Sequence, residues 1–265
     1  MTADSYEIYA VRYAHHHRMS SENFYGGDPH DVPMPLDYFV WAIVGEDRTV
    51  ILDTGFDSAM AKKRGRDFLH PPREGLLAVG VDPAKVEDVV ISHMHYDHAG
   101  NDGLFPNARF HLQDREMAFC TGRCMAHPQL RRSFEEADVV SMIQRLWRGR
   151  VCFHDGDDEI ASGITVHRVG GHTAGLQFAR VRTARGWVVL ASDASHFYAN
   201  FEERRAYATV YNVGDMLDGF ERLTRLASSR NHVIPGHDPL VMRRYPPAKP
   251  GLEGIVVRLD VEPRD

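Results

Sequence analysis

The stretch His93-Met94-His95-Tyr96-Asp97-His98 places four metal-binding side chains within six residues. It follows the apolar run Val89-Val90-Ile91, which predicts a buried strand. The four side chains are therefore expected where a strand ends, at one edge of a sheet. Imidazole and carboxylate ligands together suit zinc and its first-row neighbours, whereas calcium and magnesium prefer oxygen ligands alone. The stretch predicts a metal site at a sheet edge.

Within this motif the four ligands divide between two ions. His93 and His95 alternate as strand residues do, so both can point the same way and bind one metal. Asp97 and His98 lie past the strand end, where the chain turns, and can face a second metal. Two metals roughly 3.5–4 Å apart can hold a reacting carbonyl or phosphoryl group from both sides. The motif therefore predicts a dinuclear centre.

Three more ligand-type residues follow other strand-like runs, in Gly171-His172, Ser192-Asp193 and Pro235-Gly236-His237. A carboxylate can bridge two metals, and Asp193 is the natural candidate for this role. His172 would then complete the ligands of the first metal, and His237 those of the second. Isolated histidines elsewhere are expected to be ordinary surface residues or hydrogen-bonded core residues: His111, His127, His154 and His167.

Asp53-Thr54-Gly55 closes another strand-like run, 50–52. An acidic side chain at this place can accept the second N–H of a ligating histidine and so fix its tautomer and orientation. A simple turn, with Gly55 at positive φ, explains the same residues structurally. Both readings can hold at once, and Asp53 is predicted to support a ligating histidine.

Composition indicates an ordinary globular chain. Of its 265 residues, 43% are hydrophobic and 26% are charged, with no linker-like stretch, so one domain over 1–265 is expected. The net charge of -6, with Lys and Arg spread along the chain, gives no basic patch for nucleic acid. No apolar run is long enough for a membrane span, and the N-terminus does not resemble a signal peptide. The odd number of cysteines gives no disulfide framework, so a cytoplasmic location is expected; they are Cys120, Cys124 and Cys152.

Strand-like and helix-like segments alternate along the chain after an initial hairpin, with its turn at 45–48. This order predicts an α/β architecture in which helices cover the outer faces of sheets. Strands are expected at 8–11, 39–44, 49–52, 89–91, 151–153, 164–167, 187–190, 232–234 and 255–257. Helices are expected at 58–69, 113–120, 128–148 and 213–227.

The His-x-His-x-Asp-His motif, with Asp53 before it and His172, Asp193 and His237 after it, resembles the metallo-β-lactamase superfamily over residues 39–240. The resemblance implies a four-layer αβ/βα sandwich with a dinuclear site at the edge of two facing sheets. It also implies hydrolysis by a metal-bound hydroxide. Two divalent ions are expected, zinc by default, although iron, manganese and cobalt suit the same ligands.

Within the superfamily, the chain resembles the compact lactonase branch. Members that act as β-lactamases usually carry cysteine where Asp193 stands, and the glyoxalase II branch needs a helical domain longer than the segment after His237. Gly170-Gly171-His172-Thr173-Ala174-Gly175 and Pro235-Gly236-His237-Asp238-Pro239 look like N-acyl homoserine lactonases and their pyridoxolactonase-type relatives. The resemblance thus implies a small-molecule lactone substrate and a quorum-quenching activity.

The same resemblance implies the substrate contacts. In this branch an N-terminal loop, here 15–38, lines the active site, so Phe24 and Tyr25 are expected to contact the substrate. Those lactonases commonly set a tyrosine three residues after the bridging aspartate. This chain has His196 at that position, with Tyr198 two residues further on, and both are expected near the substrate.

The expected mechanism is attack on the lactone carbonyl by a hydroxide that bridges the two ions. Asp97 is expected to orient this nucleophile and to carry its proton to the leaving oxygen. His196 is a candidate donor to the oxyanion or the substrate. Asp97 and His196 are thus the predicted catalytic residues.

The sequence leaves three other functions and a homodimeric assembly open. A hydrolase of amides, cyclic imides, thioesters or phosphodiesters would use the same two ions. A mononuclear-iron oxidoreductase such as a persulfide dioxygenase is disfavoured by the full second ligand set. A catalytically inactive binding module is disfavoured by the complete motif. A homodimer, through the N-terminal loop or the predicted helix 128–148, is left open.

Overall fold

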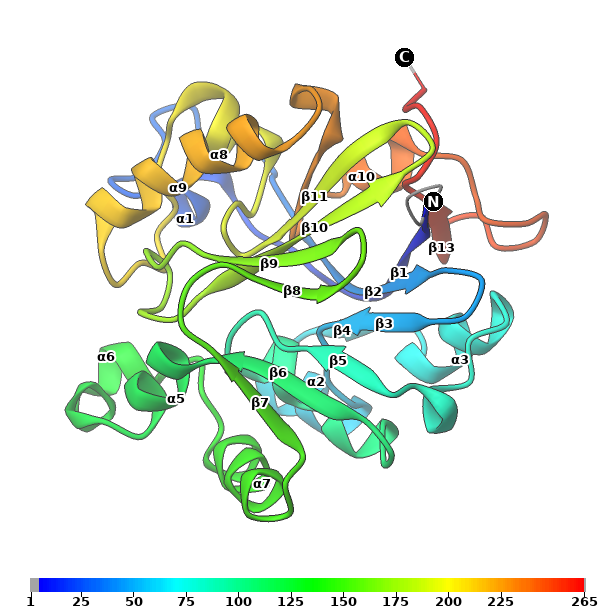
Figure 1. Cartoon of the computed structure of the whole chain (residues 1–265). Coiled ribbons are helices and arrows are strands. Elements are labelled where there is room, and N and C mark those ends of the chain that lie inside the picture. Colours follow the sequence, from blue (N-terminus) through cyan, green and yellow to red (C-terminus); the bar gives the residue numbers. More distant parts are fainter. Residues whose placement is uncertain (1–4, 265) are drawn as a thin grey trace.

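Two β-sheets face each other in the structure, a computed structural model that describes residues 5–264 (Figure 1). The strands are β1 (Glu7–His16), β2 (Leu36–Val44), β3 (Thr49–Leu52), β4 (Asp67–Phe68), β5 (Asp88–Val90), β6 (Arg109–Gln113), β7 (Val151–His154), β8 (Asp158–Ala161), β9 (Ile164–Arg168), β10 (Gln177–Thr183), β11 (Gly186–Ser192), β12 (Val233–Pro235) and β13 (Val256–Arg258). The eight-stranded sheet has the order β13-β1-β2-β3-β5-β6-β7, with β4 paired to β1, and the five-stranded sheet has the order β12-β11-β10-β9-β8.

Helices cover the outer faces of both sheets. They are α1 (Ser20–Asn23), α2 (Ser58–Arg64), α3 (Pro72–Ala78), α4 (Tyr96–Ala99), α5 (Asp114–Cys120), α6 (Pro128–Arg131), α7 (Glu136–Trp147), α8 (Tyr198–Glu203), α9 (Val213–Leu226) and α10 (Leu240–Arg244). Figure 1 shows α2, α3 and α7 beneath the larger sheet and α8 and α9 above the smaller one. The predicted four-layer αβ/βα sandwich is confirmed.

Strand β2 shows how the sequence divides between two cores. Phe39 and Trp41 point between the sheets, whereas Val40 and Ala42 point to the helix-covered face. This alternation follows from the two-residue period of a strand. Each large apolar side chain buried in this way contributes roughly 1.5–3 kcal/mol. The sandwich is stable because both faces of β2 are covered.

The strand directions bring the chemically important loops to one edge. Strands β3, β5, β6 and β7 are parallel neighbours, and β11 and β12 are parallel in the other sheet. The loops that follow β3, β5, β11 and β12 carry the ligand-type residues. Because carboxyl ends of parallel strands share an edge, loops far apart in sequence meet there.

The segment 128–148 is two helices, so the prediction of one long helix was wrong. Helix α6 ends at Arg131 and α7 begins at Glu136. Between them, Ser133 accepts a hydrogen bond from the backbone N–H of Tyr96 at 2.9 Å, and Phe134 forms a β-bridge with His95. The helical spacing of apolar residues continues across the break. The backbone there, however, pairs with the loop that carries His95 and Tyr96 instead of forming helical hydrogen bonds.

The predicted helix 58–69 is also shorter than expected. It ends at Arg64, and the capping residue Gly65 adopts a left-handed conformation with φ of 62°, as glycine does readily at helix ends. Residues 67 and 68 instead pair with β1 as β4. Four strands had not been predicted at all: β4, β6, β8 and β10.

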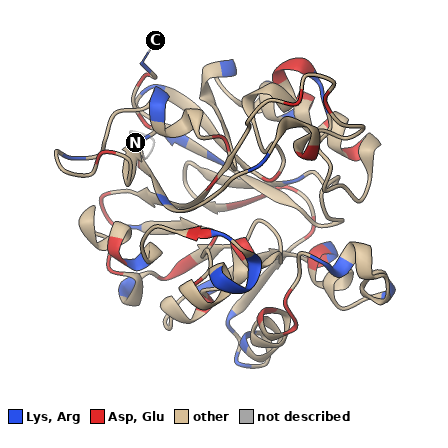
Figure 2. Cartoon of the chain, turned by 180° about the vertical axis from the view of Figure 1, so that it is seen from behind, with Lys and Arg blue, Asp and Glu red and all other residues tan. Residues whose placement is uncertain are grey.

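Charged residues of both signs are interspersed along the elements seen from behind in Figure 2. Within residues 5–264, the structure holds no helix with the length and apolar character needed to cross a membrane.

Asp138 is a partly buried carboxylate in the first turn of α7. Its Oδ2 is buried and has no hydrogen-bond partner among the described residues. Burial, and after it the charges of Asp102 and Glu135, raises the pKa of Asp138 from its ordinary 3.8 to about 7. The folded protein therefore holds this proton more tightly than the unfolded chain does, and stability falls as pH rises through this range.

We expect Asp138→Asn to raise the free energy of unfolding by about 1 kcal/mol near pH 8, and by much less near pH 4.5. The gain is limited because the side chain is only half-buried. Urea unfolding at both pH values measures it. Glu136→Gln removes an exposed carboxylate from the same turn and should give no gain. An equal effect of Asp138→Asn at both pH values would contradict the prediction.

Candidate metal centre

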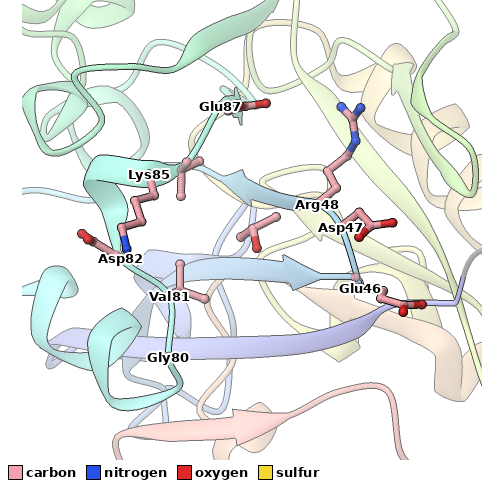
Figure 3. Close-up of a pocket in the computed structure, with 11 residues that line it drawn as sticks. Glu46, Asp47, Arg48, Gly80, Val81, Asp82, Lys85 and Glu87 are labelled. Carbon is pink, nitrogen blue, oxygen red and sulfur yellow. The ribbon is translucent and has the colours of Figure 1, made fainter.

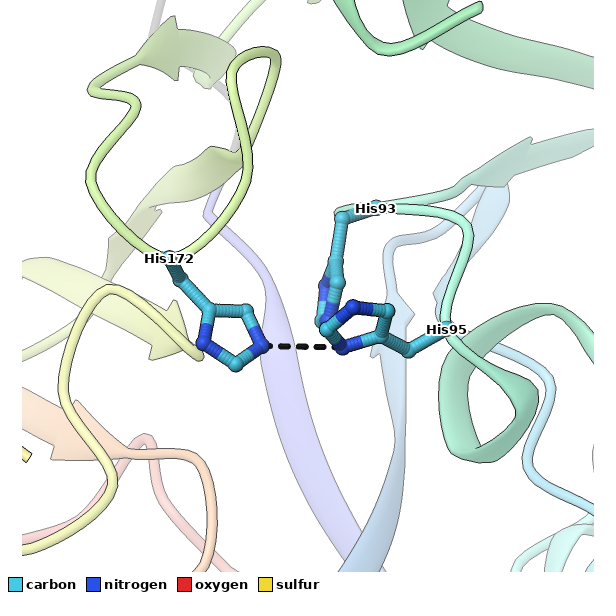
Figure 4. A group of neighbouring side chains, drawn as sticks. All are labelled: His93, His95 and His172. Carbon is cyan, nitrogen blue, oxygen red and sulfur yellow. Dashed lines mark hydrogen bonds between the residues drawn. The ribbon is translucent and has the colours of Figure 1, made fainter. Parts of the chain in front are cut away.

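The loop after β5 presents the first imidazoles. His93, His95 and His172 are buried and form what we call the imidazole group. His95 Nδ1 lies 2.9 Å from His93 Nε2 and 2.9 Å from His172 Nε2, and Figure 4 shows the rings converging from two loops. Three ring nitrogens gathered at one point form the face of a metal site.

A second cluster lies beside it. Asp97, His98 and His237, which we call the mixed group, also bring one ligand atom each close together. Asp97 Oδ2 lies 3.6 Å from His98 Nε2 and 3.8 Å from His237 Nε2. The short helix α4 holds both Asp97 and His98, and the loop after β12 supplies His237.

Asp193 joins the two groups. Its Oδ2 lies 3.2 Å from His172 Nε2, on the side of the imidazole group. Its Oδ1 lies 2.9 Å from His237 Nε2 and 3.3 Å from His98 Nε2, on the side of the mixed group. Gly236 lets the loop of His237 lie close to the loop of Asp193, because a Cβ at Gly236 would lie 2.5 Å from the carbonyl oxygen of Ser192. The structure thus brings together all seven residues that the sequence proposed as metal ligands.

The tautomers of three rings follow from their outer partners. His172 Nδ1 donates to the carbonyl of Thr209 at 2.6 Å, and His237 Nδ1 donates to the carbonyl of Asp37 at 2.9 Å. His98 Nδ1 donates to Asp53 Oδ2 at 2.8 Å. In the neutral form of each ring, Nε2 therefore carries a lone pair directed at the centre.

This donor set fits a bound cation. His98 Nε2 and Asp193 Oδ1 are buried, and neither has a hydrogen-bond partner within residues 5–264. Burial lowers the pKa of His98, but Asp193 and Asp97 outweigh it and raise the pKa well above its ordinary value. Lone pairs and carboxylates converge here, so the surroundings favour positive charge. Divalent ions with nitrogen and oxygen ligands meet this requirement.

Asp53 organises the loops around the centre. Its carboxylate accepts hydrogen bonds from Ser92 N, Ser92 Oγ, Ser192 Oγ and His98 Nδ1 at distances of 2.7 to 2.9 Å. Asp53 and Ser192 both have positive φ, of 63° and 45°, which L-residues seldom adopt. The hydrogen bonds hold these two strand ends in place. Neither serine was predicted to have a role, although each directly precedes a ligand candidate.

Glu116 is another supporting residue that the sequence did not reveal. This buried carboxylate accepts hydrogen bonds from Met94 N at 2.9 Å, Thr173 Oγ1 at 2.6 Å and Gly175 N at 3.1 Å. It therefore ties the loop after β5 to the loop that carries His172. A Cβ at Gly175 would collide with the backbone of Glu116, so glycine is needed there.

A solvent-connected cavity of about 80 Å³ opens onto the centre. It reaches His95, His172, Asp97, Asp193, His196 and His237. Its remaining walls are the apolar or aromatic Leu36, Tyr38 and Tyr96, the small polar residues Ser133 and Thr209, and the arginines Arg18 and Arg66. No local sequence pattern marks Arg18 or Arg66 as functional.

The residues predicted to contact substrate lie elsewhere. Phe24 is buried beneath the guanidinium of Arg205, which lies 3.6 Å from its ring centroid. Tyr25 is 61% exposed. Tyr198 lines a separate cavity and packs against the Arg244 guanidinium at 4.2 Å. None of the three lines the cavity at the centre. The residues of the N-terminal segment that line it are Arg18, Leu36 and Tyr38.

A further hollow of about 410 Å³ lies between the β2–β3 turn and the segment 80–87 (Figure 3). Its walls carry charges of both signs, from Glu46, Asp47, Arg48, Asp82 and Lys85. It sits where β3 and β5 begin, at the opposite end of these strands from the metal-ligand candidates.

The fold and the site define an αββα protein whose histidines and aspartates can hold metal ions where two sheets meet. Residues 34–245 match the family model of the metallo-β-lactamase superfamily. This match covers most of the chain, and the chain belongs to that superfamily.

The chain is similar to several N-acyl homoserine lactonases. It is 31% identical to N-acyl homoserine lactonase AttM of Azorhizobium caulinodans, over 61% of this chain and 62% of the relative. It is 25% identical to an N-acyl homoserine lactonase of a Bacillus species, over 77% and 82%. A solved N-acyl homoserine lactone hydrolase, with the product N-hexanoyl-L-homoserine at its catalytic metal centre, has a TM-score of 0.73 and 21% identity, covering 92% of this chain and 96% of its own. The structural likeness shows a shared fold.

Proposed function

We propose that the chain is a hydrolase that opens a lactone ring at a centre of two divalent ions. The observation that carries the proposal is the placement of Asp193, whose two oxygens face the imidazole group and the mixed group respectively. The lactonase names of its relatives support a lactone as substrate.

Two divalent ions bound there would supply Lewis acidity and an acidified water molecule. The imidazole group would hold one ion and the mixed group the other, with Asp193 shared between them. Zinc is the first choice for these ligands, and iron, manganese and cobalt are alternatives.

The overall reaction adds one water molecule across the acyl C–O bond of the ring. Hydroxyl joins the acyl carbon, and the proton goes to the ring oxygen that leaves as an alcohol. The new carboxylic acid then ionises at neutral pH. Each turnover therefore releases one proton to the solution.

Asp97 is placed to handle the proton. It is buried at the cavity, and its Oδ2 lies within 4 Å of both histidines of the mixed group. A carboxylate at this position can orient the attacking water and pass its proton to the leaving oxygen. We propose Asp97 as both a ligand and the catalytic proton carrier.

His196 orients Asp193. Its Nε2 donates to Asp193 Oδ2 at 2.9 Å, since a carboxylate can only accept. Its ring stacks on Tyr207 at a centroid distance of 3.7 Å, and the Tyr207 hydroxyl donates to the backbone carbonyl of Asp193. We propose His196 as a positioning residue, and its direct donation to the substrate stays a prediction.

Proton release in weak buffer tests the proposed function. Metal-replete protein is offered short and long acyl homoserine lactones, fused aromatic lactones, and an amide and a phosphodiester as controls. We expect ring opening of at least one lactone class, with loss of activity after chelation and recovery on adding metal.

Turnover of a control compound with no lactone opened would overturn the lactonase assignment and point to another dinuclear hydrolase. Oxygen uptake with a single bound iron would favour the oxidoreductase alternative. Protein that binds no metal after incubation with zinc, iron, manganese or cobalt would contradict the proposed centre itself.

A further inference from the structure

Two arginines at the cavity have no carboxylate partner. Arg18 donates to the backbone carbonyl of Glu22 at 2.6 Å. Arg66 donates to the Tyr96 hydroxyl at 3.2 Å and contacts His16 Nε2 at 3.1 Å. Among residues 5–264, neither guanidinium forms an ion pair.

Some arginines of this chain form ion pairs and others do not. Guanidinium groups elsewhere meet carboxylates, as in the pairs Arg48–Asp88 at 2.9 Å and Arg64–Glu135 at 2.6 Å. A half-buried cation without a counterion is unfavourable unless something compensates it. Arg18 and Arg66 are the two arginines that line the cavity at the candidate metal centre.

Groups of both signs act on these arginines: Asp97 attracts Arg66, and Arg66 repels Arg18. Burial, and after it the charges of Arg66 and Arg18, lowers the pKa of His16 to about 4, so this neighbour is neutral at neutral pH. Arg18 also experiences repulsion from Arg66 and Arg132. The carboxylate of Glu22 attracts Arg18, but it accepts a hydrogen bond from Met19 N at 2.8 Å in the capping of α1.

With divalent ions bound at the centre, its carboxylates would not neutralise these arginines. Asp97 and Asp193 are the acidic residues that line the cavity. Under the proposed function both of them bind divalent ions, whose charge exceeds that of the nearby carboxylates. Arg18 and Arg66 then remain as surplus positive charge beside the position of the substrate.

We propose that the substrate is a small lactone that carries a carboxylate group, bound by Arg18 and Arg66 while its ring carbonyl faces the metal centre. This inference rests on the proposed function. A guanidinium matches a carboxylate with two parallel hydrogen bonds. The cavity of about 80 Å³ places both arginines in the same walls as the metal-ligand candidates, which suits a small charged ring. Ring opening of such a substrate gives a hydroxy-dicarboxylate.

A matched pair of substrates tests this inference. One is a γ-butyrolactone with a carboxylate on the ring carbon next to the ring oxygen, and the other is its primary amide, equal in shape but neutral. For the metal-replete wild type we expect kcat/KM for the carboxylate to exceed that for the amide by at least about tenfold. Arg18→Gln and Arg66→Gln should each reduce this preference by about tenfold, mainly through KM.

Two further variants act as controls. Arg148→Gln removes an exposed arginine at the end of α7, next to the start of β7, and should keep the full preference. Arg66→Lys keeps the positive charge but loses the two-pronged hydrogen bonding of a guanidinium. It should retain part of the preference for the carboxylate over the amide. Circular dichroism and thermal unfolding check that each variant is folded. Equal kcat/KM for the carboxylate and the amide in the wild type would overturn the inference while leaving the lactonase assignment intact.

Binding separates this inference from the proposed function. Tetrahydrofuran-2-carboxylate has no bond to hydrolyse, and calorimetry on the metal-replete protein compares it with its amide. We expect tighter binding of the carboxylate, weakened about tenfold or more by Arg66→Gln. If no lactone is opened but the protein still binds the carboxylate more tightly than the amide, the lactonase assignment fails. The proposed recognition of a carboxylate by the two arginines would then still hold. Undiminished carboxylate binding in both glutamine variants would overturn the inference.

Discussion

Replacing His95 by alanine is expected to remove metal and activity together. His95 Nδ1 lies 2.9 Å from the ligand atoms of both other members of the imidazole group, so its loss opens the centre of that group. Lewis acidity contributes several kcal/mol to such reactions, so kcat/KM should fall by about a thousandfold or more. Elemental analysis after dialysis and proton release with the best lactone measure both effects.

His127→Ala provides the matched control, because His127 is exposed in the turn before α6. It should leave metal content and kcat/KM unchanged. Full activity of His95→Ala with one metal lost would show that a single ion suffices. Unchanged metal content and activity would remove His95 from the ligand set.

Replacing Asp53 by alanine is expected to destabilise the folded protein by about 3 kcal/mol or more, even without metal. The change leaves four buried donors, from Ser92, Ser192 and His98, without their acceptor. Alanine also tolerates the φ of 63° less well than aspartate does. Denaturant unfolding of metal-free protein measures the loss.

Metal binding should weaken as well. Without the Asp53 acceptor, the tautomer of His98 is no longer fixed, and loss of such a partner typically costs 10–100-fold in metal affinity, as a rough guide. Asp155→Ala, at an exposed position between β7 and β8, should change neither property. A loss of stability below about 1 kcal/mol would show that the four donors find other partners or water.

Local pattern was sufficient to locate the ligand candidates. A short apolar run predicts a buried strand, and a polar residue just after it must lie at a sheet edge. This reasoning placed His93, Asp193 and His237 at strand ends, where the structure has them, after β5, β11 and β12. The family match confirms the superfamily that the motif resembled.

Local pattern failed where backbone pairing was decided by distant segments. The apolar spacing over 128–148 predicted one helix, but residues 133 and 134 pair with the loop of His95 and Tyr96 instead. Strand β10 was not predicted, because its sequence mixes arginines with apolar residues. It nevertheless lies at the middle of the smaller sheet.

The cavity walls belong to the tertiary structure alone. Arg18 follows β1 and Arg66 follows α2, and neither sits in a periodic pattern that marks it as functional. They meet the metal centre because β1 and β4 pair and the two sheets pack face to face. The N-terminal loop residues Phe24 and Tyr25 point elsewhere for the same reason. Sequence determined which residues stand at strand ends, since burial alternates locally along a strand. Only the packing of the sheets decided which other side chains surround those ends, because these contacts join segments far apart in the chain.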